Sequence, residues 1–285
     1  MKSKGQIIAL LLILVSVSCE KDANNVKLPQ FGHKLVVTSF ISPYDSVSYV
    51  TIDSNERLYG DLSDIEPLGN VKVTISDGTK KIDLKKGNIQ YYFRRKDMAI
   101  RAGGTYNLEV TSDKGLRADA KCSIPFQRDL NITADTVTLH NNNPDIGSWS
   151  ERSIKVFLED PPGEKNYYSV EGRLLDYNRF YGGYPYITNL YNEEEIWFND
   201  EGSDGKQIFA NSFRSQYNPL DSDSLKAVIY ILNTNKDYFT YHKSLTKYSG
   251  GDNPFSEVSP VFSNINGGLG IFAGYTVDSI VLRLE

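Results

Sequence analysis

The sequence is poor in the residues that most often carry chemistry. Its 285 residues include two cysteines, three histidines, two methionines and two tryptophans, against nineteen tyrosines and thirteen phenylalanines. The histidines His33, His140 and His242 are far apart, and there is no H-E-x-x-H motif, so no zinc site is indicated. A G-x-S-x-G motif is also missing, and so few histidines disfavour a serine–histidine pair. We therefore expect a protein that is not an enzyme, with no catalytic residues and no cofactor.

Long hydrophobic runs are missing except at the N-terminus. Lys2 and Lys4 precede an apolar run over residues 7–15, which is too short for a stable membrane helix. Small residues then lead to Cys19. This pattern predicts that residues 1–18 are a secretory signal peptide and that Cys19 becomes lipidated. Ser18 fits a lipid-attachment site, whereas Ser16 stands where Leu, Val or Ile is usual, and an ordinary cleaved signal is the alternative.

Residues 19–30 are expected to be a lipidated tether. Several acyl chains on Cys19 would anchor the protein to a membrane, since one chain alone binds only marginally. The residues after it, Glu20-Lys21-Asp22, resemble the surface-export tag of lipoproteins from Bacteroidota-type bacteria, although a plain solvated tether is the alternative. We expect localisation at the outer membrane, on the cell surface. The formal net charge of −5 argues against nucleic acid as a partner.

Residues 31–126 are predicted to form an immunoglobulin-like β-sandwich. About seven short strand patterns recur there, separated by turn residues such as Asp77-Gly78. In the last of them, Leu116 to Ile124, apolar residues alternate with charged ones. Cys122 falls on the apolar face, so we expect a buried small side chain rather than a reactive thiol. With Cys19 modified, Cys122 has no partner for an intramolecular disulfide.

Residues 127–285 are predicted to form a second, β-rich domain with one amphipathic helix. The helix spans about residues 236–248, with Tyr238, Tyr241, Leu245 and Tyr248 on one face and Asn235 or Thr234 as its cap. Strands are expected on either side of it. Residues 140–144 and 160–163 are expected to be loops. A last strand is expected over residues 279–284.

Two further stretches have features of binding sites for phosphate or metal ions. The glycine-rich segment 267–274 lacks the Lys-Ser/Thr of a phosphate-binding loop, so its glycines are interpreted as allowing close backbone packing. The segment 199–205 contains Asp200 and Asp204, which are candidate calcium ligands. In an EF-hand register the twelfth position would be Asn211 instead of an acid, so a turn is the main interpretation.

One aromatic stretch is a candidate contact surface. Residues 180–186 read Phe-Tyr-Gly-Gly-Tyr-Pro-Tyr, which predicts a loop tip or an extended hairpin carrying Tyr181, Tyr184 and Tyr186. Exposed rings on a rigid scaffold suit sugar stacking or protein docking. The alternative is that these rings fold back into a local core.

The C-terminal tail resembles a known family. It combines Tyr-Phe-Thr-Tyr-His at 238–242 with Asn-Pro-Phe-Ser at 253–256 and Ser-Asn-Ile-x-Gly-Gly-Leu-Gly-Ile-Phe-x-Gly-Tyr at 263–275. These motifs are similar to those of the domain-of-unknown-function 4249 family (DUF4249). Weaker similarity extends to Leu35-Val36-Val37, to residues 71–78 and to 160–168. The resemblance implies a lipoprotein of Bacteroidota-type bacteria, often encoded beside TonB-dependent outer-membrane receptors. It implies no functional residues.

Together these observations predict a lipid-anchored outer-membrane surface protein that works by binding. The expected role is a binding or docking accessory of a TonB-dependent uptake system, with a small-molecule or glycan ligand that the sequence does not identify. The alternative is a structural or adhesion module of the cell surface without a nutrient ligand.

Overall fold

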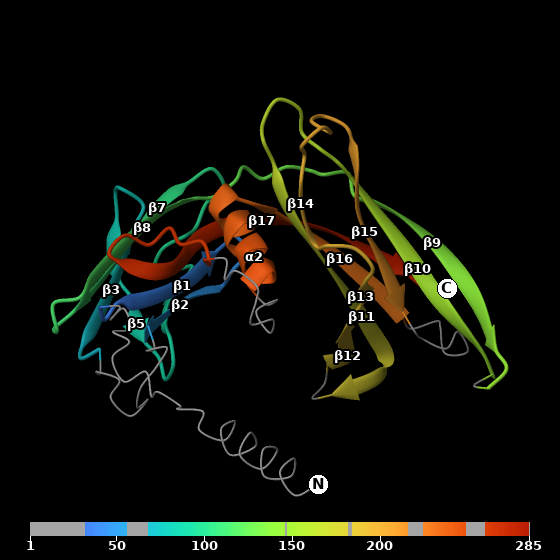
Figure 1. Cartoon of the computed structure of the whole chain (residues 1–285), viewed down its shortest axis with the longest axis horizontal. Helices are drawn as coiled ribbons and strands as arrows, with labels where there is room; N and C mark the ends of the chain where they lie inside the picture. The colour runs from blue at the N-terminus through green and yellow to red at the C-terminus, as the bar shows by residue number, and fades with distance from the viewer. Residues whose placement is uncertain are drawn as a thin grey trace, which may run out of the picture. The chain divides into compact units, whose positions relative to one another are not determined.

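The alternation of apolar and polar residues explains why most of this chain forms strands. In β8 (Arg117–Ser123), Ala118, Ala120 and Cys122 are buried while the residues between them are exposed. A computed structural model describes residues 32–55, 68–145, 147–181, 184–215, 225–248 and 260–284. Within these ranges strands predominate, and the expectation of a mostly β fold is confirmed (Figure 1).

Eight strands form a two-sheet sandwich in the first part of the chain. One sheet has the order β1-β2-β6-β5 and the other the order β4-β3-β7-β8. This is the strand order of an immunoglobulin-like sandwich, in which the strands A-B-E-D face C′-C-F-G. The two sheets share a hydrophobic core, with Val37 and Phe93 from one sheet packed with Ile75 and Leu108 from the other. The strands are β1 Leu35–Ile41, β2 Val47–Ser54, β3 Val71–Ser76, β4 Lys81–Asp83, β5 Lys85–Lys86, β6 Tyr91–Arg94, β7 Thr105–Ser112 and β8 Arg117–Ser123.

The second part of the chain forms another pair of sheets around a second core. Strands β12, β11, β16 and β17 are neighbours in one sheet, and the other has the order β13-β15-β10-β9. Val170 and Ile229 from the first of these sheets pack with Ile154 and Phe213 from the second. The strands are β9 Thr133–Asn143, β10 Gly147–Glu159, β11 Tyr167–Tyr181, β12 Tyr184–Asn189, β13 Tyr191–Asn192, β14 Trp197–Asn199, β15 Gln207–Ser215, β16 Leu225–Thr234 and β17 Gly268–Arg283.

Strand β17 joins the two parts. It pairs in parallel with β1 and antiparallel with β16, so one sheet continues from β12 to β5 (Figure 1). Because side chains alternate along a strand, its even-numbered positions face the two cores. Phe272 belongs to the first core, and Ile280 and Leu282 pack against the second. Its odd-numbered positions Ile271 and Ala273 face α2 (Lys236–Tyr248).

The predicted division at residues 126 and 127 separates the two cores except for Ile265 and Phe272, which belong to the first. Residues 33–285 cluster as one unit, and the division into two domains stays a prediction. Two local predictions were wrong. Residues 140–143 belong to β9 instead of a loop, because they pair with β10 up to the turn before Gly147. The last strand begins at Gly268, eleven residues before the predicted start at Ser279.

The glycines of β17 allow its backbone to lie against β1. Gly270 has φ +108, and a Cβ atom there would lie 2.1 Å from the carbonyl oxygen of Val37. At Gly274 a Cβ atom would lie 2.2 Å from Cδ1 of Ile124 and 3.1 Å from the sulfur of Cys122. No side chain fits at either distance. The interpretation of this segment as close backbone packing is confirmed.

Helix α2 begins and ends where the sequence predicts. The side chain of Asn235 caps it, since its Oδ1 accepts a hydrogen bond of 3.0 Å from the backbone N–H of Tyr238. Tyr238 is buried against β17, whereas Tyr248, at the last turn, is 50% exposed. The predicted aromatic stripe therefore packs on the sheet over its first turns only. Among the described residues, no helix is both long and apolar enough to cross a membrane.

His242 lies among aromatic rings on the inner face of α2. Its ring stacks on Trp197 at 4.3 Å between centroids and on Phe40 at 5.2 Å. Its Nε2 atom is buried and has no hydrogen-bond partner within the described ranges. Burial lowers the pKa of His242 to about 4, because the charged imidazolium would lose its hydration there. His242 is therefore neutral where it packs α2 against Trp197 and Phe40.

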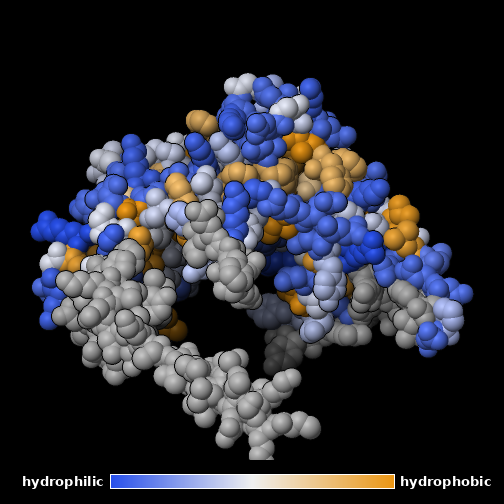
Figure 2. All heavy atoms as spheres, in the orientation of Figure 1, coloured by the Kyte–Doolittle hydropathy of each residue, from blue (hydrophilic) through white to orange (hydrophobic). Residues whose placement is uncertain are grey.

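The surface seen in Figure 2 is mostly hydrophilic. Hydrophobic residues appear on it as small separate patches. Isolated exposed apolar residues are ordinary on soluble proteins and need no special explanation. On the described part of this face, a binding surface must therefore be sought among particular side chains instead of one broad apolar area.

We predict that Gly270→Ala destabilises the fold by disrupting the pairing of β17 with β1. The matched control is Gly78→Ala, since Gly78 also has positive φ, +89, but a Cβ atom there meets nothing within 4 Å. Gly270→Ala should lower the free energy of unfolding by roughly 2 kcal/mol more than Gly78→Ala, as measured by urea denaturation. Equal losses would show that the close approach to Val37 does not matter.

We predict that His242 makes the fold less stable as the pH falls. The folded pKa of about 4 lies below the ordinary value of 6.5, so the folded state binds fewer protons than the unfolded state. The contribution of His242 to the free energy of unfolding is then fully present above pH 6.5, and it decreases as the pH falls toward 4. Between pH 7.5 and 4.5, urea denaturation should show the wild type losing about 1–2 kcal/mol more than His242→Phe, after allowance for the exposed part of the ring. Parallel losses in both proteins would contradict this.

Candidate functional site

Two groups of side chains stand out as candidate sites. The acidic cluster consists of Asp160, Asp200 and Asp204. The tyrosine surface consists of Tyr184 and Tyr186, which lie on β12. The geometry of the acidic cluster is set by two loops that meet at the ends of several strands.

The loops of the acidic cluster follow β10 and β14. Asp160 comes directly after β10 and opens the Pro161-Pro162-Gly163 turn, while Asp200 comes directly after β14. The loop after Asp200 turns at Gly202 and Gly205, which have φ +81 and +67. The backbone N–H of Asp160 donates a hydrogen bond of 3.0 Å to the carbonyl of Lys206, which holds the two loops together.

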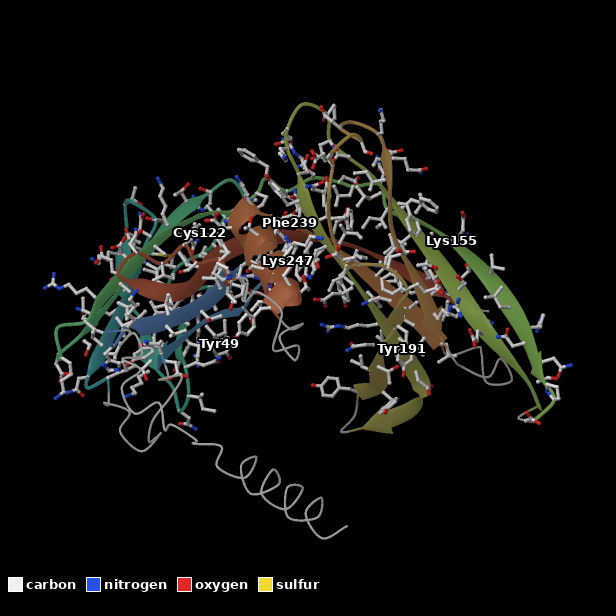
Figure 3. All side chains as sticks on the ribbon, in the orientation of Figure 1. Tyr49, Cys122, Lys155, Tyr191, Phe239 and Lys247 are labelled. Atoms are coloured by element: carbon white, nitrogen blue, oxygen red, sulfur yellow. The ribbon has the colours of Figure 1, made fainter. Side chains whose placement is uncertain are left out.

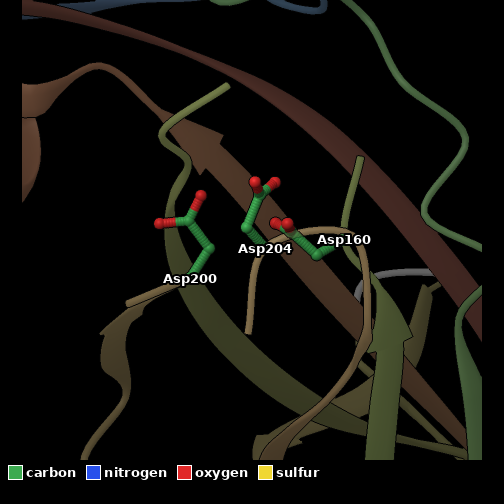
Figure 4. Close-up of side chains that lie close together, drawn as sticks. All are labelled: Asp160, Asp200 and Asp204. Atoms are coloured by element: carbon green, nitrogen blue, oxygen red, sulfur yellow. The ribbon is translucent and has the colours of Figure 1, made fainter. Parts of the chain in front are cut away.

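The three carboxyl groups converge in space (Figure 4). One oxygen from each lies within 4.8 Å of the others. Asp160 and Asp200 are 5% and 4% exposed, and Asp204 is exposed. Buried carboxylates are rare unless they have partners, so the contacts that each one makes decide what the cluster does.

Each carboxylate accepts a hydrogen bond from a backbone N–H of the opposite loop. Asp160 Oδ2 accepts from Gly205 at 3.0 Å, Asp200 Oδ2 from Asn166 at 2.7 Å and Asp204 Oδ1 from Gly163 at 2.7 Å. These charge-assisted bonds fix the positions of the two loops relative to each other.

The hydroxyl of Tyr168 is a further partner. It donates a hydrogen bond of 2.6 Å to Oδ1 of Asp160, and the tyrosine is fully buried. Burial raises the pKa of the Asp160 carboxyl, and the nearby carboxylates of Asp200 and Asp204 raise it further, while the bonds from Tyr168 and Gly205 oppose this. Burial and the Asp160 carboxylate together raise the pKa of Tyr168 well above its usual range, so its hydroxyl keeps its proton.

The sequence identified two of the three acids. The sequence predicts Asp200 and Asp204 as candidate calcium ligands, and the structure brings them together with Asp160, which the sequence predicts only as part of a loop. Asn211, the twelfth position of the EF-hand register, lies instead in β15, where its side chain bonds to the backbone of Glu194. The cluster is therefore not an EF-hand. The missed signal was a second acid-containing turn, at 160–163.

The tyrosine surface lies on the predicted hairpin. Strands β11 and β12 pair antiparallel with Tyr181 opposite Tyr184, so the expectation of an extended hairpin is confirmed. Tyr184 and Tyr186 are 73% and 47% exposed. The side chain of Tyr181 lies outside the described residues. Tyr191, labelled in Figure 3, is 69% exposed where the chain passes from β12 to β13.

Of the two cysteines, only Cys122 lies within the described residues. Cys19 lies outside the described residues, so its lipidation stays a prediction. Cys122 is 1% exposed, and burial raises the pKa of its thiol far above the ordinary value. Its predicted role as a small buried side chain is confirmed, and Figure 3 shows it within the first sandwich.

Comparison with known families identifies the chain as a member of one of them. Residues 22–280 match the family described as Domain of unknown function (DUF4249), and the chain belongs to that family. A search of curated proteins gives no match. The family assignment predicted from the tail motifs is thereby confirmed, and it brings no activity with it.

We predict that Tyr168→Phe destabilises the loops of the acidic cluster. The substitution removes the hydroxyl that donates to Asp160 and leaves a buried carboxylate with one partner fewer. The free energy of unfolding should fall by roughly 1.5–3 kcal/mol. Tyr230→Phe, at a half-buried tyrosine whose hydroxyl makes no hydrogen bond in the described structure, is the control. Thermal denaturation measures both, and equal stability of the two variants would contradict the prediction.

Proposed function

We propose that this member of the DUF4249 family is a lipid-anchored protein of the outer-membrane surface that acts by binding a partner. The anchor is assigned to Cys19, at the end of the signal-like segment. The observation that carries the binding role is the tyrosine surface on β12. The partner proposed is the extracellular side of a TonB-dependent receptor, for which the protein is an accessory in ligand uptake.

The tyrosine surface suits docking because its rings are exposed on an ordered strand. Tyr184 and Tyr186 are 73% and 47% exposed, and they share one face of β12 because side chains alternate along a strand. Tyrosine at an interface gives a large contact area at low entropic cost, and it is among the residues that contribute most to binding. Leaving these rings in water forgoes the free energy that burial would provide.

The position of β12 supports the same proposal. In the order of the sheet, β12 is the last strand, paired on one side with β11. An edge strand offers unpaired backbone N–H and C=O groups to a partner strand. Pro185 removes one of these N–H groups, so contacts through the side chains carry more weight than extension of the sheet.

A binding role is favoured over catalysis by the environment of the reactive residue types. Cys122 is buried with a raised pKa, and His242 is enclosed by aromatic rings with a lowered pKa. Neither is placed to act as nucleophile or general base. The link to a transporter rests on family context, which is an associational argument. An adhesion or structural module without a nutrient ligand is the competing proposal.

We predict that the protein co-purifies with a receptor barrel through the tyrosine surface. Tagged full-length protein is recovered in mild detergent from its native outer membrane, as wild type, as Tyr184→Ala/Tyr186→Ala and as Tyr44→Ala. Tyr44 is 52% exposed in the first sandwich and provides the matched control. Wild type and Tyr44→Ala should recover a TonB-dependent barrel in equal amounts, and the double variant at least ten-fold less.

Protease treatment of intact cells accompanies the pull-down. Wild type should be cleaved from whole cells, whereas Cys19→Ala should leave the membrane fraction. If the protein is cleaved from intact cells but is recovered without a barrel, the result would contradict the role as a transporter accessory and favour an adhesion role. A barrel recovered equally with all three variants would place the docking surface elsewhere.

A further inference from the structure

We propose that the acidic cluster, together with Asn166, binds a calcium ion. This site is separate from the tyrosine surface that is proposed for docking. The acidic cluster lies in the loops after β10 and β14, whereas the tyrosine surface lies on β12. The ligand is a hard divalent cation held by side-chain oxygens. The proposal rests on three observations: a buried amide oxygen without a partner, three carboxylates without a counter-ion and the distance between their oxygens.

The amide oxygen belongs to Asn166. This residue is 6% exposed, and its Oδ1 atom is buried without a hydrogen-bond partner in the described structure. A buried amide oxygen in a native protein is nearly always satisfied. An unpartnered one therefore indicates a ligand or water that completes its coordination.

The backbone places this amide beside the cluster. Tyr167 pairs with Asn199 at the end of the β11–β14 ladder, and Asn166 and Asp200 are the residues directly beyond that pair. The backbone N–H of Asn166 donates to Oδ2 of Asp200 at 2.7 Å, and that of Asp200 donates to the carbonyl of Asn166 at 3.4 Å. These two hydrogen bonds hold Asn166 next to Asp200, at the edge of the acidic cluster.

The charge of the cluster is not balanced by the protein. Within the described ranges, none of the three acids forms an ion pair with a lysine, arginine or histidine. Their only described partners are neutral N–H groups and the Tyr168 hydroxyl. Like charges this close repel, and burial of two of them increases the cost. A divalent cation at the point where they converge (Figure 4) removes both penalties.

The donor set and its dimensions favour calcium. Every candidate ligand atom is an oxygen, whereas zinc prefers nitrogen and sulfur. The carboxylate oxygens lie within 4.8 Å of one another, and two ligands on opposite sides of Ca²⁺ are about 4.6–5.2 Å apart, since each Ca–O distance is 2.3–2.6 Å. Mg²⁺ requires shorter metal–oxygen distances in a stricter octahedral arrangement. Amide and carboxylate oxygens in flexible loops suit calcium better.

Bound calcium would join two loops that are forty residues apart in the sequence. Asp160 and Asn166 belong to the loop between β10 and β11, and Asp200 and Asp204 to the loop between β14 and β15. The ion would fix the ends of all four strands. Affinity in the range of extracellular calcium modules, with Kd roughly 10⁻⁴–10⁻³ M, is expected for a site of few charges.

The competing explanation is that the three acids only bind backbone N–H groups of the opposite loop. Substitution of Asp by Asn separates the two explanations, because an amide oxygen still accepts these hydrogen bonds but loses the charge. Asp204→Asn is the first variant, since Asp204 is exposed and its change is the least disruptive to folding. Asp200→Asn is the second. Asp135→Asn is the matched control, because Asp135 is exposed on β9 and its side chain makes no hydrogen bond or ion pair in the described structure.

The experiment is calcium titration of the purified full-length protein in detergent, after removal of metal with a chelator. Calorimetry gives Kd for CaCl₂, with MgCl₂ as the comparison, and circular dichroism confirms that each variant is folded. The wild type and Asp135→Asn should bind one Ca²⁺ with equal affinity. Asp204→Asn and Asp200→Asn should bind about ten-fold more weakly or worse, given the effect of altering even outer ligands.

Tyrosine-sensitised terbium luminescence provides a second readout. Tb³⁺ replaces calcium in oxygen sites, and Tyr168 donates to Asp160 within the cluster. Wild type should give terbium emission that calcium displaces, and Asp204→Asn should give much less. No saturable heat with calcium up to ~10 mM, ten-fold above the weakest extracellular class, would overturn the proposal. Equal calcium affinity in Asp204→Asn and Asp135→Asn would also overturn it, and tighter binding of magnesium would overturn the assignment to calcium.

Discussion

The parallel pairing of β17 with β1 is the interaction on which the rest of the structure depends. Seven residues of β1, Leu35 to Ile41, are in register with Gly268 to Gly274. Through this pairing the edge strand of the immunoglobulin-like sandwich becomes an interior strand of a longer sheet. Strand β17 then contributes side chains to both hydrophobic cores. Because the partners are more than two hundred residues apart, chain entropy opposes the contact strongly. Side chains of β17 in both cores support it, with Phe272 in the first core and Ile280 and Leu282 against the second.

Features that depend on local pattern could be predicted from the sequence. The alternation in residues 116–124 predicted β8, and the bounds of α2 followed from its apolar face, the cap at Asn235 and the glycines after it. Features that depend on distant contacts could not. Residues 268–275 contain glycines that usually interrupt strands, yet they form one here because backbone approach to β1 requires residues without side chains. Asp160 was missed for the same kind of reason, since its neighbours come from another loop.

The two candidate sites are related through β11. This strand begins at Tyr167, beside the acidic cluster, and ends at Tyr181, opposite Tyr184 of the tyrosine surface. Its fifteen residues span about 50 Å when extended. The acidic cluster therefore lies at the start of the strand whose other end pairs with β12, which carries the tyrosine surface. The two sites share no residue, so substitutions can be made in each of them separately.

The position of β17 also has a consequence for biosynthesis. A chain is made from its N-terminus, so β1 exists long before the strand that covers its edge. Until residues 268–274 are available, the first sandwich presents a strand edge with exposed N–H and C=O groups. Any product that terminates before Gly268 keeps this edge open, and it is then prone to pair with other chains or to be degraded. A polypeptide that includes residues 268–274 therefore differs from any shorter product in having the edge of β1 covered.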